Sequence, residues 1–469
     1  MSDFRELQDC FKGTGRIAGL LPRELLSKMR REGAELLGLG VANRPLLSLL
    51  PRLGVTNVVV RDRRPPDGEA LSLIEAAGAR IVTGDGYLEG LGTGVLFRTP
   101  SLRPDAKPLL AAADRGATVT SEVALFLALC PARLFCVTGS DGKTTTAMMT
   151  AAMLRAAGRR VFLGGNIGTP LLEALPDITA DDAAVLELSS FQLSDLPPPR
   201  GNAAITNVTE NHLDWHTDMQ EYAAAKARIL GDGRAVLPAD CPWLTPHLAR
   251  EGALPFSLTP RAAGEGARLF CEGGRAVLWD GSARALFPTT AVTLRGEHHI
   301  KNALAAAGLV LGEVTPDEME TALLGFRGAP HRCEYVGTYR GVACYDSSID
   351  TTPSRTAATL SAFRGEVVVL LGGRDKNLDL APLGEAVTSG AVGAVVTGEC
   401  REAIAHAIRE RDPAFPLAVV ADFSSAVAVA HRMAAGRGAL LLSPACTSFD
   451  AFRDYRERGH TFREALENL

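Results

Sequence analysis

The sequence of 469 residues lacks any C-x-x-C pair, any long apolar run and any strong excess of one charge. Its nine cysteines are scattered, so neither a zinc site nor a disulfide framework is indicated, and a reducing cytoplasm is the expected compartment. No apolar stretch reaches the ~18 residues of a membrane span, and the polar N-terminus has no signal-peptide core. A net charge of −5 gives no sign of a nucleic-acid partner.

A glycine turn near one third of the chain is the most informative stretch. Residues 137–146, Val-Thr-Gly-Ser-Asp-Gly-Lys-Thr-Thr-Thr, follow a short predicted strand (134–137) and precede a helical run (147–157). Strand, turn and helix together form a phosphate cradle, in which Lys143 adds positive charge and the Thr144 hydroxyl can bind Mg²⁺. The usual first glycine is replaced by Val137, and a plain strand-to-helix turn is the alternative.

Further polar clusters follow predicted strands in the same region, beginning at Gly164, Glu187 and Asn207. Ligands collect at the carboxyl ends of strands in open parallel sheets, so we expect these clusters to converge with the phosphate loop on one site. Glu187 is a candidate Mg²⁺ ligand together with Thr144, unless it caps a helix or lies on the surface.

Two residues are ambiguous on sequence alone. His212 is a ligand of a second metal ion, a hydrogen-bond donor or a structural histidine in a polar turn. Lys226, on a helix predicted over 221–229, has the pattern of a solvated helix lysine. The later turn 372–376, Gly-Gly-Arg-Asp-Lys, also follows a strand and suits a carboxylate or phosphate, or is an ordinary turn.

An incomplete dinucleotide fingerprint lies near the N-terminus. Residues 38–43, Gly-Leu-Gly-Val-Ala-Asn, follow a predicted strand and carry Asn43 in place of the third glycine. Asp62 follows the next predicted strand (56–60) and lies 22 residues beyond Gly40, which suits a hydrogen bond to a ribose-like or uridine group. The alternative is a Rossmann-like domain whose turn only packs against neighbouring elements and binds no ligand.

A phosphate loop, two candidate metal positions and a cationic turn in a later domain are what an ATP-driven ligation needs. A carboxylate and a phosphoryl group repel by roughly 4 kcal/mol per charge pair at 4 Å and an effective dielectric near 20. Mg²⁺ and Lys143 would offset this repulsion, so that an acyl phosphate forms and an amine displaces the phosphate.

The pattern of elements predicts an α/β fold with three domains, since the chain is too long for one core. These are a Rossmann-like N-terminal domain, a central P-loop ATPase domain with a parallel sheet, and a Rossmann-like C-terminal domain. We place an N-terminal arm at 1–32 and the domains at 33–128, 129–328 and 329–469. Within the central domain, 240–295 is expected to be an irregular β-containing insertion.

The ordered motif set resembles the Mur ligases over about residues 34–469. The motifs are the phosphate loop, Gly165-Asn166-Ile167-Gly168, Glu187-Leu188-Ser189-Ser190-Phe191-Gln192-Leu193, Asn207-Val208-Thr209-Glu210-Asn211-His212-Leu213-Asp214, Gly296-Glu297-His298 with Asn302, Pro330-His331-Arg332, and Ser443-Pro444-Ala445-Cys446. The resemblance implies an ATP-dependent ligase that joins D-glutamate to UDP-N-acetylmuramoyl-L-alanine in peptidoglycan precursor synthesis. It also implies two Mg²⁺ ions and a carbamylated Lys226, which overrides the solvated-lysine interpretation.

The resemblance assigns residues to each substrate. The implied catalytic residues are Lys143, His212 and Lys226, and the metal ligands are Thr144, Glu187, His212 and Lys226. The implied ATP contacts are Gly139, Ser140, Asp141, Gly142, Lys143, Thr144, Thr145, Asn302, Arg332 and Asp346. The implied contacts to the other substrates are Val41, Ala42, Asp62, Arg63, Asn166, Gln192, Lys376, Ser448, Phe449 and Tyr455. Partners are expected to be these small molecules alone, with the protein a monomer.

One segment departs from the family pattern. Many members have Asn-Asp-Ser-Lys-Ala-Thr-Asn where this chain reads Tyr-Asp-Ser-Ser-Ile-Asp-Thr at 345–351, which looks more like a clostridial-type variant. The alternatives are therefore the same ligation with L-glutamate, another Mur or folylpolyglutamate-type ligase, and a non-catalytic UDP-sugar-binding protein. Intact Lys143, Glu187, His212 and Lys226 argue against the last.

Overall fold

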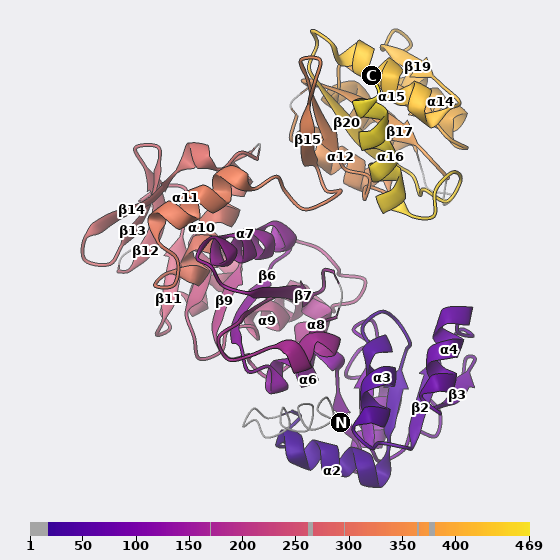
Figure 1. The fold of residues 1–469 in the computed structure, drawn as a ribbon, viewed down its shortest axis with the longest axis vertical. Helices are drawn as coiled ribbons and strands as arrows, with labels where there is room; N and C mark the ends of the chain where they lie inside the picture. Colours follow the sequence, from indigo (N-terminus) through magenta and orange to yellow (C-terminus); the bar gives the residue numbers. More distant parts are fainter. Residues whose placement is uncertain (1–16, 169, 261–265, 295, 364, 375–379) are drawn as a thin grey trace. The chain divides into compact units, whose positions relative to one another are not determined.

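The computed structural model describes residues 17–168, 170–260, 266–294, 296–363, 365–374 and 380–469 (Figure 1). The chain separates into two compact units, one running to Val292 and including His298–Leu324, the other comprising Thr293–Glu297 and Gly325–Leu469. The first unit contains two sheets and the second contains one, so each of the three predicted α/β regions has its own sheet. In the described ranges, no helix has both the length and the apolar character to cross a membrane.

The first sheet is five-stranded and parallel, in the order β3-β2-β1-β4-β5. Its strands are β1 (Ala34–Leu37), β2 (Val58–Asp62), β3 (Arg80–Thr83), β4 (Val95–Arg98) and β5 (Thr118–Thr120). Its helices are α2 (Pro22–Glu32), α3 (Arg44–Arg52), α4 (Gly68–Ala76) and α5 (Lys107–Asp114), and α6 (Glu122–Leu129) follows β5. Helix α2, from the predicted arm, buries Leu25, Leu26 and Met29 in the same core as Leu36 of β1.

The second sheet is nine-stranded, in the order β14-β13-β12-β11-β10-β9-β6-β8-β7. Its strands are β6 (Arg133–Thr138), β7 (Val161–Gly165), β8 (Ala183–Glu187), β9 (Asn202–Ile205), β10 (Ala235–Pro238), β11 (Ala253–Phe256), β12 (Arg268–Glu272), β13 (Arg275–Trp279) and β14 (Ala283–Pro288). Only β12, β13 and β14 pair antiparallel. The predicted irregular insertion is therefore a regular extension of the central sheet.

Helices and short 3₁₀ turns surround this sheet. They are α7 (Lys143–Ala156), α8 (Ser190–Leu193), α9 (Met219–Ala227), α10 (Glu297–Val310), α11 (Pro316–Gly325), η1 (Leu171–Asp177), η2 (Pro242–His247) and η3 (Thr289–Ala291). Helix α7 begins at Lys143, four residues before the predicted start. It begins there because Gly142, with φ 77°, provides the left-handed turn that precedes it.

The second unit holds a six-stranded sheet in the order β15-β16-β20-β17-β18-β19. Its strands are β15 (Glu334–Tyr339), β16 (Val342–Asp346), β17 (Val367–Gly372), β18 (Gly393–Thr397), β19 (Leu417–Val419) and β20 (Ala439–Ala445). Its helices are α12 (Pro353–Ser361), α13 (Ala381–Gly390), α14 (Arg401–Arg411), α15 (Phe423–Ala434) and α16 (Tyr455–Glu467). Strand β17 is a continuous buried apolar run, as expected for a parallel strand covered on both faces.

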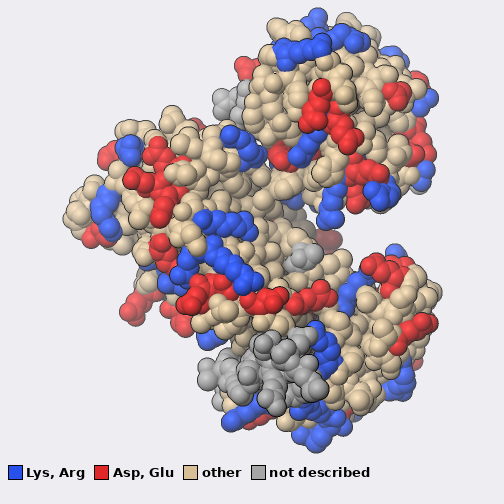
Figure 2. All heavy atoms as spheres, viewed as in Figure 1, with Lys and Arg blue, Asp and Glu red and all other residues tan. Residues whose placement is uncertain are grey.

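Basic and acidic side chains are interspersed on the face shown in Figure 2. Both signs occur on each visible region of the surface, in keeping with 49 basic and 54 acidic residues in the sequence.

Candidate active site

The predicted polar clusters meet at the carboxyl ends of four neighbouring strands. Strand β6, which leads into the phosphate loop, lies between β9 and β8, and β7 flanks β8. Glu187 ends β8 directly beside Gly165 of β7 and Val137 of β6. Parallel pairing places all four strand ends at one edge of the sheet, which confirms the convergence that the sequence predicts.

The phosphate loop is tightly packed against its neighbours. A Cβ atom built on Gly139, at φ 152°, would lie 1.8 Å from the Thr206 hydroxyl oxygen, so only glycine fits there. A Cβ atom on Gly142 would lie 2.4 Å from Oδ1 of Asn302, on helix α10. The predicted nucleotide residue Asn302 therefore lies against the phosphate loop.

Backbone and side-chain hydrogen bonds fix the middle of the loop. The Asp141 amide donates to Oδ1 of Asn207 at 2.9 Å, and Nδ2 of Asn207 donates to the Asp141 carbonyl oxygen at 3.1 Å. The Ser140 hydroxyl donates to the Thr209 carbonyl oxygen at 3.0 Å and lies 3.0 Å from the Tyr222 hydroxyl. These contacts hold the loop in one shape before any ligand arrives, as a preorganised anion site requires.

Glu187 is buried and bridges two other predicted residues. The Thr144 hydroxyl donates to its Oε2 atom at 2.7 Å, and Nδ2 of Asn166 donates to its Oε1 atom at 2.9 Å. A hydroxyl oxygen beside a carboxylate is a donor set that suits Mg²⁺, which prefers oxygen ligands. Thr144 and Glu187 therefore fit one magnesium ion.

Lys226 points into the phosphate loop instead of into solvent. It is 1% exposed, and its Nζ atom donates to the Gly139 carbonyl oxygen at 2.7 Å. Its Nζ atom also lies 4.3 Å from the ring centroid of Tyr222. The side chain of Lys143 donates to the carbonyl oxygens of Gly139 at 3.0 Å and Ser140 at 2.8 Å, so the two lysines share an acceptor.

Burial and the nearby positive charges lower the pKa of two groups at this site. Burial, and then the charge of Lys143, lowers the pKa of Lys226 to about 6, against the opposing effect of Asp141 and Glu187. Burial, Lys143 and Lys226 also lower the pKa of His212. His212 has φ 56°, a conformation that is uncommon outside glycine and is often found at functional sites.

An unmodified lysine does not fit a magnesium site, because Mg²⁺ binds oxygen and this amine is itself a hydrogen-bond donor. A buried amine whose pKa is about 6 is, however, mainly unprotonated at neutral pH. That is the form that adds carbon dioxide.

Gln192 has a local role as well as its predicted one. Its side-chain oxygen accepts from the Ser189 amide at 2.9 Å, which completes a capping box at the start of α8. Helix α8 is held by the buried Arg98 of β4, which donates to the Phe191 carbonyl oxygen at 3.0 Å and to Oδ2 of Asp195 at 2.6 Å. This contact joins the first sheet to the region that carries Gln192.

The N-terminal turn uses its polar side chains internally. Asn43 is buried and donates from Nδ2 to the carbonyl oxygens of Gly38 at 2.8 Å and Phe97 at 3.2 Å. Asp62 accepts from the Leu39 amide at 2.8 Å through Oδ2. The predicted residues Val41 and Arg63 are exposed, with Arg63 paired to Asp85 at 2.9 Å. Ala42 lies in the same turn, so the group remains together at one edge of the first sheet.

In the second unit, Asp346 ends β16 within a buried polar group. Its Oδ2 atom lies 2.8 Å from Nδ1 of His331 and accepts from Arg463 at 3.1 Å, and its Oδ1 atom accepts from the Ser348 amide at 2.8 Å. Burial opposes the charged form, but hydrogen bonds from His331 and Ser348 outweigh it and lower the pKa of Asp346. Arg463 also donates to Glu334 at 2.6 Å. The Arg463 guanidinium already supplies the positive charge beside the Glu334 and Asp346 carboxylates, so the cluster of His331, Glu334 and Asp346 does not fit a metal ion.

The remaining residues predicted for this unit have different positions. Arg332 is exposed next to His331. The Tyr455 ring lies 5.8 Å from the His331 ring, close to Asp346, which is predicted to contact ATP. Ser448 is buried after β20, and Phe449 is 59% exposed. Lys376 lies outside the described residues.

Two contacts of the site escape sequence reasoning. Tyr222 lies under Lys226 and beside Ser140, although in sequence it is one apolar position of an alanine-rich helix. Arg458, 1% exposed, donates to the carbonyl oxygens of Ser348 at 2.9 Å and Cys446 at 3.1 Å, tying two strand ends together. An arginine buried in a polar helix leaves no signal in the sequence pattern.

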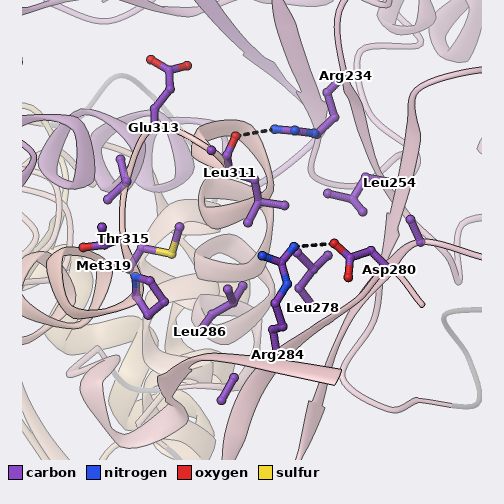
Figure 3. Close-up of a pocket in the computed structure, with 15 residues that line it drawn as sticks. Arg234, Leu254, Leu278, Asp280, Arg284, Leu286, Leu311, Glu313, Thr315 and Met319 are labelled. Atoms are coloured by element: carbon purple, nitrogen blue, oxygen red, sulfur yellow. Dashed lines mark hydrogen bonds and ion pairs between the residues drawn. The ribbon is translucent and has the colours of Figure 1, made fainter. Parts of the chain in front are cut away.

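A cavity of about 520 Å³ lies in the first unit, away from the predicted residues (Figure 3). Leu254, Leu278 and Met319 form apolar walls, and Arg234 donates to the Leu311 carbonyl oxygen at 3.1 Å. None of the predicted site residues lines this cavity. The candidate active site is therefore defined by the strand-end cluster and not by this cavity.

Comparison with known proteins identifies the family. A model described as the Mur ligase middle domain matches residues 137–310, and one described as the Mur ligase glutamate ligase domain matches residues 331–446. Proteins named UDP-N-acetylmuramoylalanine–D-glutamate ligase from Clostridium novyi and Acetivibrio thermocellus are each 35% identical. Both alignments cover 94% of this chain, with 98% and 97% of the relatives.

Solved structures show the same fold. UDP-N-acetylmuramate–alanine ligase from Thermotoga maritima aligns with a TM-score of 0.52 at 19% identity, over 93% of this chain and 99% of that one. A UDP-N-acetylmuramoyl-L-alanyl-D-glutamate–2,6-diaminopimelate ligase aligns with a TM-score of 0.53 at 17% identity, over 88% and 92%. Taken with the relatives that share over a third of its residues along nearly all of its length, these matches place the chain in the Mur ligase family.

Proposed function

We propose that this protein is the ATP-dependent ligase that joins D-glutamate to UDP-N-acetylmuramoyl-L-alanine, a cytoplasmic step of peptidoglycan precursor synthesis. The observation that carries the proposal is the meeting of the phosphate loop, Glu187 and Lys226 at adjacent strand ends. The names of the relatives from Clostridium novyi and Acetivibrio thermocellus support the choice of substrates.

The central domain would bind ATP. Backbone amides of residues 139–145 and the Lys143 side chain would surround the phosphates, and Asn302 would contact the nucleotide from helix α10. Thr144 and Glu187 would hold Mg²⁺, which offsets the negative charge of the phosphates when it is bound. Arg332 and Asp346 of the C-terminal domain would complete the nucleotide contacts.

A second Mg²⁺ would be held by His212 and a carbamylated Lys226. The neutral imidazole of His212 offers a lone pair, because burial, and then the charge of Lys143, lowers its pKa. Lys226 lies at the loop that contains Gly139, where the carbamate oxygens would face the phosphates. Carbamylation would give the Lys226 side chain a negative charge, so that Lys143 would be the main cation at this loop.

The remaining predicted residues would hold the other substrates. Val41, Ala42, Asp62 and Arg63 would contact the UDP portion, and Asn166 and Gln192 the muramoyl portion. Lys376, Ser448, Phe449 and Tyr455 would hold glutamate. We propose domain boundaries near residues 33, 129 and 329 and a monomeric protein.

The reaction would proceed in two transfers. The carboxylate oxygen of the alanyl group attacks the γ-phosphorus of ATP, the bond to the β-phosphate oxygen breaks, and ADP leaves. The neutral amine of glutamate then attacks the acyl carbon, and phosphate leaves with the bonding electron pair as the amine loses its proton. Lys143 stabilises the charge that develops on the transferred phosphoryl group.

The L-glutamate alternative has a specific observation behind it. Ser348 stands where many members have lysine, and it is fully buried, with its hydroxyl 3.3 Å from Nδ1 of His331. A cation that many relatives carry in this segment is therefore replaced by a small side chain that faces the protein interior. Substrate contacts in this unit consequently differ from the common pattern.

Phosphate release measured with ATP, UDP-N-acetylmuramoyl-L-alanine and each of three amino acids tests the proposal. D-glutamate should give the highest rate, with L-glutamate and meso-diaminopimelate near background. Faster release with L-glutamate would establish the alternative. Background release with all three would contradict the ligase assignment, provided that a relative assayed in parallel is active.

A further inference from the structure

Two cysteines from distant parts of the sequence meet in the second unit. Cys400 follows β18 and forms the N-cap of α14, and Cys446 directly follows β20. Their Sγ atoms lie 2.9 Å apart although they are separated by 46 positions. Both are buried, and neither belongs to a disulfide in the structure.

The surrounding backbone holds this pair in place. The Cys400 thiol also donates to the Gly373 carbonyl oxygen at 2.9 Å, and the Cys400 amide donates to the same oxygen at 3.0 Å. Arg374 and Thr447 exchange two backbone hydrogen bonds, of 2.9 and 3.0 Å. Arg458 binds the Cys446 carbonyl oxygen from the other side. The three turns that follow β17, β18 and β20 are thus fastened to one another around the two sulfur atoms.

A covalent bond between the sulfurs requires little movement. A disulfide has an S–S distance of about 2.05 Å, so the two Sγ atoms must approach by about 0.9 Å from their separation of 2.9 Å. A thiolate is the form that peroxide oxidises. Peroxide is small enough to reach a thiol through local opening of these turns.

We propose that Cys400 and Cys446 are an oxidation-sensitive thiol pair that peroxide converts to a disulfide. In the first step, one thiol and one peroxide molecule give a sulfenic acid and water, and the peroxide O–O bond breaks as sulfur is oxidised. In the second step the other thiol attacks that sulfur, an S–S bond forms, and the sulfenic oxygen leaves as water. Dithiothreitol reverses the change by thiol–disulfide exchange.

The disulfide impairs the amino-acid site, a consequence that rests on the proposed function. Ser448, a proposed glutamate contact, lies two residues after Cys446 and shares its turn. Drawing Cys446 toward Cys400 shifts this turn and removes the thiol donor to Gly373. The expected effect is an increase in KM for glutamate of at least tenfold, with KM for ATP changed less than twofold.

Mass spectrometry of the full-length protein tests the pair directly. Trypsin leaves Cys400 and Cys446 on separate peptides that end at Arg401 and Arg453. After treatment with hydrogen peroxide, these peptides should appear cross-linked, 2 Da lighter than their sum, and separate again with dithiothreitol. Cys400→Ser should prevent the cross-link and the increase in KM, since a serine hydroxyl keeps the hydrogen bond to Gly373. Cys344→Ser, at another buried thiol in the same sheet, should prevent neither.

Failure of the peptides to cross-link at peroxide concentrations that oxidise other thiols of the protein would overturn the proposal. A cross-link that leaves KM for glutamate unchanged, or an equal loss of activity in oxidised Cys400→Ser, would overturn the link to the amino-acid site. The cross-link is scored by mass, whatever the activity. A reduced protein inactive with every substrate would therefore count against the proposed function and not against the thiol pair.

Discussion

The Nζ atom of Lys226 donates a hydrogen bond of 2.7 Å to the carbonyl oxygen of Gly139, 87 positions earlier in the sequence. This contact places an amine from helix α9 directly on the phosphate loop. Lys226→Ala should lower the rate of phosphate release by about 100-fold or more, the loss typical of a removed electrostatic contact in an active site.

Acetate or propionate should restore part of the activity of Lys226→Ala, because a small carboxylate can occupy the space of the carbamate. The measurement is the phosphate-release rate as a function of added acid, with chloride at equal ionic strength as the control. Full activity of the variant without any acid would rule out a metal-binding role for Lys226.

Glu187→Gln should raise the Mg²⁺ concentration needed for half-maximal phosphate release by at least tenfold. The substitution keeps the size of the side chain but removes the charge that faces Thr144. A magnesium titration of the rate measures the effect, with the exposed Glu173→Gln as the matched control. An unchanged magnesium requirement would show that Glu187 is not a ligand.

Gly139→Ala should destabilise the protein by about 2 kcal/mol or more, because the new methyl group would overlap the Thr206 hydroxyl. Urea unfolding measures this loss. Gly68→Ala is the control, since a Cβ atom there meets nothing within 4 Å and Gly68 begins helix α4. A Gly139→Ala protein as stable as the wild type would show that the loop relaxes freely.

Glu122 should make the free energy of unfolding depend on pH. It is buried in helix α6, and burial raises its pKa to about 8, above its value in the unfolded chain. A raised carboxyl pKa favours the folded state while the group is protonated, so this contribution is complete below the unfolded pKa and disappears as pH rises through 8.

Between pH 6 and 9 the wild type should lose about 2–3 kcal/mol more stability than Glu122→Gln, which carries no titrating group there. Urea unfolding at several pH values measures the difference. Parallel pH profiles for the two proteins would contradict the raised pKa.

The sequence predicts the convergence of the central site well because each polar cluster directly follows a short apolar run. Parallel pairing then brings those ends together without any long-range information. The prediction of three α/β regions succeeds for the same reason, since apolar runs mark the strands of all three sheets.

The sequence does not predict which side chains meet inside the site. Lys226 has the spacing of a solvated lysine, yet its helix also buries Tyr222, Ala223 and Ala225. Alanines give little hydrophobic periodicity, so the buried face of α9 is not visible in the pattern. The contact of Gly139 with Thr206 likewise depends on strand order, which spacing alone does not determine. The β content of 240–295 is predicted, but the regular pairing of these strands with the central sheet is not, because glycines and prolines separate them.

The two hydrogen bonds of the Asn43 side chain affect how a ligand can bind to the first sheet. Strands β2 and β3 lie on one side of β1, and β4 and β5 lie on the other. The strand order therefore reverses between β1 and β4, and ligands of such sheets bind in the crevice at that point. Asn43 spans this crevice, because its side chain donates hydrogen bonds to Gly38, which follows β1, and to Phe97 of β4. The side-chain amide of Asn43 thus links the ends of β1 and β4. A ligand that binds at this point would contact the turn and would not separate the two strands.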